Sequence, residues 1–229
     1  MKKSFLSLAA IFIIFFLGKP ESVVADVSLN INEIVRADTL GSHVNKEFTR
    51  NEGEGLEVFV NRVAYELYGE EVSRNHPAIE TTHWVADVST IILFFNTIID
   101  DDDAVEGFIL FSKDEIKYNL IRIDNYLPAG NGAEIASVFF ANADSDPDKE
   151  LIVLCTWPQR IKLTAEGTLY QTYIYDDLNS SVYQDKLIYL ADISGHFGLE
   201  FEGWQEGDNV KARYKNASAI RAELKRLGY

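Results

Sequence analysis

Oxygen-bearing side chains alternate along one short segment of the chain. Asn142, Asp144, Asp146, Asp148 and Glu150 occupy every second position, and an apolar run follows directly. Carboxylates crowded into one loop repel one another unless water or a cation lies between them. Ca²⁺ takes roughly six to eight oxygen ligands, so this spacing predicts a calcium site built from these five residues.

The same segment resembles the calcium loop of FG-GAP and related integrin-like repeats, which is itself similar to the front half of an EF-hand. The resemblance covers only this loop and the start of the apolar run after it. It implies that the side chains of Asn142, Asp144 and Asp146 bind the ion directly. It also implies that Asp148 offers its backbone carbonyl and that Glu150 completes the shell.

Two positions differ from the family pattern. Asn142 replaces the usual leading aspartate, and Pro147 stands where the family has glycine. Glycine can adopt positive φ, whereas proline is held near about −65°, so this loop must take a different backbone path. The alternative interpretation is a solvated acidic turn whose aspartates accept hydrogen bonds from their own backbone. The residues alone leave both interpretations open.

No other motif in the sequence gives strong support for a metal site or a catalytic site. The acidic run from Asp100 to Asp103 lacks alternate spacing, and we interpret it as a solvated turn between strands. Cys155 lies inside an apolar run, which is typical of a buried structural thiol. The four histidines lack zinc-site spacing, and no nucleophile elbow, Walker loop or dinucleotide fingerprint occurs. The sequence therefore predicts no catalytic residue and favours a protein that is not an enzyme.

Charge and composition narrow the class of partner. The chain has a formal net charge of −15 and is 47% hydrophobic, which is enough apolar material for a core. Strong negative charge disfavours nucleic acid and anionic membranes and favours cationic proteins or divalent metals. The chain has one cysteine, so it cannot form an internal disulfide. A bound cation could supply the stabilisation that disulfides often give small secreted domains.

The first residues have the three-part pattern of a secretory signal. Lysines near the start precede the apolar run Phe5–Gly18, and small residues end at Ala25. The run is shorter than the roughly 20 apolar residues that a membrane span needs. We therefore expect a signal peptide over 1–25 and a single globular domain over 26–229. The expected location is secreted or periplasmic, with no membrane span in the mature chain.

Apolar spacing predicts an α+β fold with a mostly antiparallel sheet or meander. Apolar residues at spacings of three and four predict an amphipathic helix from Leu56 to Tyr68, and Asn216 is a plausible cap for a short C-terminal helix. The acidic loop is expected to close a hairpin. Strands are expected at Val27–Asn32, Trp84–Phe95, Glu106–Phe111, Tyr118–Ile123, Ile135–Phe140, Leu151–Thr156, Leu169–Tyr175 and Lys186–Ala191.

Three functions are compatible with these features. The first is an exported, non-catalytic binding or interaction domain whose loop is stabilised by calcium. The second is a secreted hydrolase that uses acidic residues, which a deep cleft lined by carboxyls of raised pKa would favour. The third is a small inhibitor or immunity-type protein whose acidic face blocks a basic enzyme. No sequence motif chooses among them.

Overall fold

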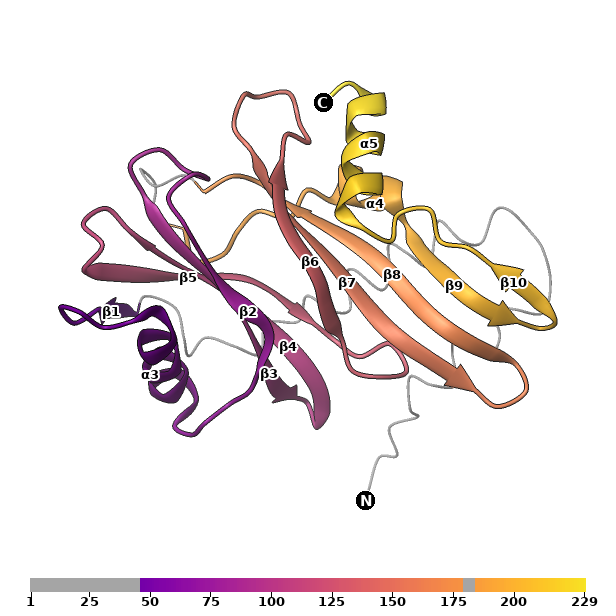
Figure 1. The fold of residues 1–229 in the computed structure, drawn as a ribbon, viewed down its shortest axis with the longest axis horizontal. Helices are drawn as coiled ribbons and strands as arrows, with labels where there is room; N and C mark the ends of the chain where they lie inside the picture. Colours follow the sequence, from indigo (N-terminus) through magenta and orange to yellow (C-terminus); the bar gives the residue numbers. More distant parts are fainter. Residues whose placement is uncertain (1–45, 179–183) are drawn as a thin grey trace, which may run out of the picture. The chain divides into compact units, whose positions relative to one another are not determined.

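Strands make up most of the structure, a computed structural model that describes residues 46–178 and 184–229. The strands are β1 (Glu47–Thr49), β2 (Arg74–Thr81), β3 (Ser89–Ile99), β4 (Asp102–Ser112), β5 (Lys117–Tyr126), β6 (Glu134–Ala141), β7 (Glu150–Ile161), β8 (Ala165–Tyr175), β9 (Leu199–Gln205) and β10 (Asp208–Val210). They form two five-stranded sheets, in the orders β1-β5-β4-β3-β2 and β10-β9-β8-β7-β6. Every neighbouring pair is antiparallel (Figure 1).

The predicted α+β class is wrong. The described residues form a mostly β structure in which the three helices are short: α3 (Leu56–Tyr68), α4 (Ala191–Phe197) and α5 (Ala217–Leu227). The sheets are larger than predicted because β1 and β10 have only three residues each and β2 lacks the apolar alternation that identifies a strand. Strand β9 was missed although Leu199 and Phe201 alternate with Glu200 and Glu202. The predicted strand Lys186–Ala191 is also wrong. That segment makes only isolated bridges before α4 begins.

The helix ends follow ordinary capping rules. Gly69 ends α3 in the left-handed conformation, at φ 75°, and its N–H donates to the carbonyl of Tyr65. The predicted cap of α5 is confirmed, because the Asn216 side chain accepts a hydrogen bond of 3.0 Å from the Ala219 N–H.

The central strands of each sheet are buried on both faces. The inner faces share one core, to which Phe94 and Ile121 contribute from the first sheet and Val153 from the second. Leu93 points the other way, into a cluster between the first sheet and α3. A third cluster packs α4 and α5 on the outer face of the second sheet. Double burial explains why strand sequences such as that of β3 are continuous apolar runs.

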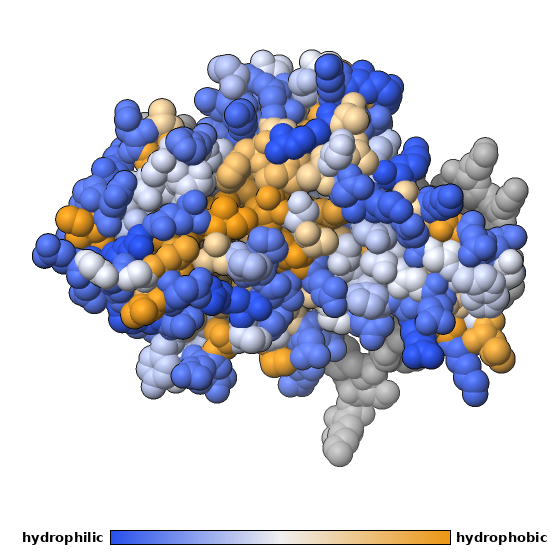
Figure 2. All heavy atoms as spheres, in the orientation of Figure 1, coloured by the Kyte–Doolittle hydropathy of each residue, from blue (hydrophilic) through white to orange (hydrophobic). Residues whose placement is uncertain are grey.

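The two sheets are joined at both sides. Asn75 of β2 accepts a 2.7 Å hydrogen bond from the Ile135 N–H of β6 and donates to the Ala133 carbonyl at 3.0 Å. Around this junction, partly buried apolar residues of the inner core reach the surface, and Figure 2 shows apolar atoms gathered over β2 and β6. On the other side, the segment after β8 crosses to the first sheet, where the Leu187 N–H donates to the Arg122 carbonyl at 2.9 Å.

Two predictions fall outside the described residues: the signal peptide over 1–25 and the strand Val27–Asn32. Within the described ranges, no helix is long and apolar enough to cross a membrane.

Strands β8 and β9 approach each other closely at a pair of glycines. Gly167 lies opposite Gly203, and a Cβ on Gly167 would lie 2.8 Å from the Gly203 Cα and closer still to the Glu202 carbonyl oxygen. Because backbone atoms cannot rotate away, we expect Gly167→Ala to lower the free energy of unfolding by about 1–3 kcal/mol in urea denaturation. Gly132→Ala is the control, since a Cβ there meets nothing within 4 Å. Equal effects of the two substitutions would contradict the close approach.

Candidate metal centre

The acidic loop closes a hairpin, as predicted. Ala141 of β6 pairs with Glu150 of β7, so residues 142–149 form the connection between them. Strand β8 runs antiparallel to β7, and its last residue, Tyr175, lies opposite Leu151. The end of β6, the start of β7 and the end of β8 therefore meet at one end of the second sheet, at the top of the view in Figure 1.

Glu150 is a buried carboxylate with one unpartnered oxygen. Its exposed fraction is 0%. Its Oε2 accepts a short hydrogen bond from the Ala143 N–H, whereas its Oε1 has no hydrogen-bond partner among the described residues. Burial raises the pKa of Glu150 to about 7, the Ala143 hydrogen bond opposes that change, and the charges of Asp144 and Asp146 add to it. A carboxylate so placed is costly unless a proton or a cation compensates its charge.

Two aspartates of the loop lie beside this carboxylate. Asp144, Asp146 and Glu150 each bring one carboxylate oxygen to within 4.8 Å of the other two. Oxygens that share an ion at about 2.4 Å lie no more than about twice that distance apart, so this group could hold a metal ion. The donors are all carboxylate oxygens, which suit a hard cation such as Ca²⁺ or Mg²⁺ rather than zinc or copper.

The loop also has the hydrogen bonds of an acidic turn. The Asp146 N–H donates to Asp144 Oδ1 at 2.8 Å, and the Asp148 N–H donates to Asp146 Oδ1 at 2.9 Å. The predicted acidic turn is therefore present. It does not prevent ion binding, because a carboxylate has about four lone-pair sites and one hydrogen bond does not exhaust them. No residue of 142–149 has positive φ, so the chain passes Pro147 without the glycine turn of the calcium loops that this segment resembles.

The side chains of the other two predicted ligands, Asn142 and Asp148, do not belong to the group of three carboxylates. The Asn142 side chain donates from Nδ2 to the Asp146 carbonyl at 2.8 Å, which fixes the amide across the loop. The carboxylate of Asp148 is outside the cluster, and only its backbone carbonyl was predicted to bind the ion.

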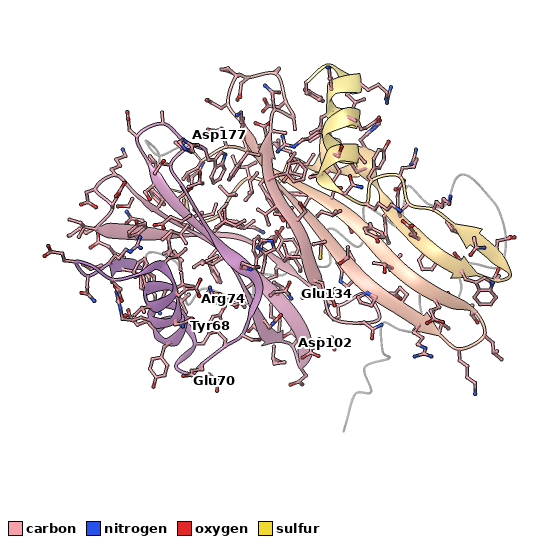
Figure 3. The ribbon with its side chains drawn as sticks, viewed as in Figure 1. Tyr68, Glu70, Arg74, Asp102, Glu134 and Asp177 are labelled. Carbon is pink, nitrogen blue, oxygen red and sulfur yellow. The ribbon has the colours of Figure 1, made fainter. Side chains whose placement is uncertain are left out.

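Sequence reasoning missed two acidic residues of this region. Asp176 and Asp177 follow β8 directly, and Asp146, Asp176 and Asp177 form a second group of carboxylate oxygens within 4.8 Å of one another. Figure 3 labels Asp177 at this end of the sheet. Burial raises the pKa of both Asp176 and Asp177, and the charges of Asp144 and Asp146 raise it further. The predicted strand Leu169–Tyr175 ends just before them, but only the register of β7 against β8 shows that the residues after Tyr175 lie beside Glu150.

The solvated turn predicted for Asp100–Asp103 is confirmed in part. Asp100 and Asp101 have φ of 53° and 71° and form the exposed turn between β3 and β4, whereas Asp102 and Asp103 are the exposed first residues of β4. Cys155 is buried in β7, and burial raises the pKa of its thiol, which opposes formation of a nucleophilic thiolate.

A hollow of about 790 Å³ opens between β2–β4 and β6–β8. Two of the amides that line it hold neighbouring backbone: Asn131 donates to the Pro158 carbonyl at 2.6 Å, and Gln159 donates to the Ala129 carbonyl at 2.6 Å. These two side chains thus fix connections that line the hollow.

Comparisons with protein-family models, with curated proteins and with solved structures found no match to this chain. A function for the protein therefore has to be inferred from the geometry of the acidic cluster.

Proposed function

We propose that the protein is an exported, non-catalytic binding domain in which a calcium ion stabilises the β6–β7 loop. Asp144, Asp146 and Glu150 hold the ion through their carboxylates, and the Asn142 side chain and the Asp148 carbonyl complete the shell as in the related calcium loops. The observation that carries the proposal is the buried Glu150 carboxylate, whose Oε1 has no hydrogen-bond partner among the described residues. A divalent ion beside it would compensate a charge that the apolar surroundings disfavour.

Calcium fits this loop better than magnesium does. Mg²⁺ demands near-octahedral geometry at about 2.0–2.1 Å and gives up its water reluctantly, whereas Ca²⁺ accepts irregular shells at about 2.3–2.6 Å. Ligands that come from an irregular loop and from the first residue of a strand suit the more tolerant ion. The ion would also link the loop to the buried start of β7, in a chain that has no disulfide.

The wider role that we propose is recognition of a cationic protein outside the cytoplasm. The net charge of −15 supports a basic partner, because opposite charge accelerates encounter and repels nucleic acid. The signal-like first 25 residues support export.

Calcium is expected to raise the thermal stability of the wild-type protein, and Asp146→Asn is expected to remove that response. Free calcium at about 100 times its dissociation constant adds about 2.7 kcal/mol, which corresponds to roughly 5–10 °C for a domain of this size. Asp101→Asn is the matched control, since it makes the same change of charge in the exposed β3–β4 turn and should keep the full increase. A melting curve that neither EDTA nor excess calcium moves would remove the metal from the proposal.

A further inference from the structure

The C-terminal helix α5 packs against the base of the acidic loop. Its two buried residues, Ile220 and Leu224, lie in the apolar cluster on the outer face of the second sheet, and Ala143 is the residue of the 142–149 loop that joins this cluster. Figure 1 shows α5 beside the loop, at the same end of the second sheet. We infer that calcium bound at the loop keeps α5 docked on the sheet, so that α5 loosens when the ion leaves. The inference rests on the proposed calcium site and adds a regulatory role to it.

Ala143 belongs to the ion site and to the helix cluster at once. Its N–H donates to the Glu150 carboxylate, and it stands in the chain between Asn142 and Asp144, two of the proposed ligands. Its side chain is 1% exposed and lies in the cluster that contains the buried face of α5. A movement of the loop therefore displaces Ala143 and removes a packing partner from beneath the helix.

The ion-free loop has a physical reason to move. Glu150 is wholly buried, and its Oε1 has no hydrogen-bond partner among the described residues. Water can reach this oxygen only if the chain around it opens, whereas a calcium ion binds the carboxylate in place. The last pair of the β6–β7 ladder is Ala141 with Glu150, so residues 142–149 can open without breaking a strand pairing.

Helix α5 is held weakly enough to respond to such a movement. It has 11 residues, two of them buried, and a helix of this length is marginal in water without packing. Its other ties are at the surface. The Glu223 carboxylate bonds to the His196 ring of α4 at 2.7 Å, and the Arg221 guanidinium lies 4.6 Å from the centre of the Phe139 ring. Segments with few buried apolar contacts are the ones that open most readily.

The test is the dissociation constant for calcium, measured by isothermal titration of the full chain with calcium alone. If calcium favours the docked helix, the docked helix must strengthen calcium binding by the same factor. We expect Leu224→Ala to weaken binding by about fivefold or more, which is the lower end of ordinary coupling between sites. Leu67→Ala is the matched control, because Leu67 is a buried leucine of α3 in the separate cluster on the first sheet, and it should leave the constant unchanged.

Hydrogen exchange of the α5 amides reads the helix directly. In the wild-type protein we expect calcium to slow this exchange, relative to EDTA, by a factor similar to the loss of affinity in Leu224→Ala. Circular dichroism establishes that each variant is folded. Ile220→Val is the second variant, since it removes one methyl group from the same buried face and should weaken calcium binding less, in the same direction.

The outcomes separate this inference from the proposed calcium site. Calcium that binds the wild-type protein and both α5 variants equally well would overturn the coupling and leave the site in place. An equal loss of affinity in Leu67→Ala would also overturn it, because the effect would then not belong to α5. No calcium binding to the wild-type protein would overturn both the site and the coupling.

Discussion

Glu150→Gln is expected to make the calcium-free protein more stable and to abolish its stabilisation by calcium. Glutamine keeps the size of the side chain and an oxygen that can accept from the Ala143 N–H, but it removes the buried charge. The pKa of Glu150 is raised from 4.5 to about 7 in the folded protein. Each tenfold change in proton affinity corresponds to about 1.4 kcal/mol of free energy. Solvent around the exposed residues of the loop screens part of this electrostatic cost. At pH 8 the charged glutamate therefore costs the apo protein on the order of 2–3 kcal/mol.

The pH dependence of this effect has a definite sign. A carboxyl whose pKa is higher in the folded state binds a proton there that the unfolded chain has already lost. The contribution of Glu150 to the stability of the apo protein therefore falls as pH rises from about 4.5 to about 7, and the glutamine variant lacks that loss. The advantage of the variant should be small near pH 4.5 and largest above pH 7.

Urea denaturation in EDTA and in saturating calcium, at about pH 5 and at about pH 8, measures these differences. Glu166→Gln is the control, because it makes the same change of charge at an exposed position of β8 and should show neither effect. A Glu150→Gln protein that is less stable than wild type in EDTA at the higher pH would contradict the costly buried charge.

Leu93→Ala and Phe94→Ala are both expected to lower the free energy of unfolding substantially. The two residues are neighbours on β3, and each is 0% exposed, yet they contribute to different core clusters. Truncation of a buried leucine costs about 2–5 kcal/mol and that of a buried phenylalanine about 3–5 kcal/mol, from lost burial and the cavity left behind. The effects should be comparable because both faces of the sheet are covered.

Denaturant midpoints measure both effects, with Ile98→Thr as the control on the same strand. Ile98 is 63% exposed, and threonine keeps the β-branched shape, so its substitution should cost less than about 1 kcal/mol. A large effect at Phe94 with little effect at Leu93 would mean that α3 does not close the outer face of the first sheet.

Part of this fold was predictable from the sequence, and the missing part has identifiable causes. The hairpin around the acidic loop was predictable because Ile135–Phe140 and Leu151–Thr156 are apolar runs separated by turn residues. Strand β2 was hidden because it contains Pro77 and two irregularities of register, which an edge strand tolerates. The two-sheet arrangement itself was not predictable, because runs buried on both faces show no alternation that would assign their sides.

The candidate site was predictable to a similar extent. The spacing of Asp144, Asp146 and Glu150 was sufficient to locate the cluster. Asp176 and Asp177 required the register of β8 against β7, which depends on where the intervening turn falls. The burial of Glu150 depends on the position of Ala143, whose N–H donates to the Glu150 carboxylate. Ala143 belongs to the apolar cluster that packs α4 and α5 on the second sheet. No local pattern predicts that contact.

The most direct measurement is anomalous diffraction from crystals grown in millimolar calcium. We expect a difference peak at about 2.3–2.6 Å from one carboxylate oxygen each of Asp144, Asp146 and Glu150. A map without density at that point, in which the two aspartates point into solvent, would contradict the cation site on which the proposed function depends.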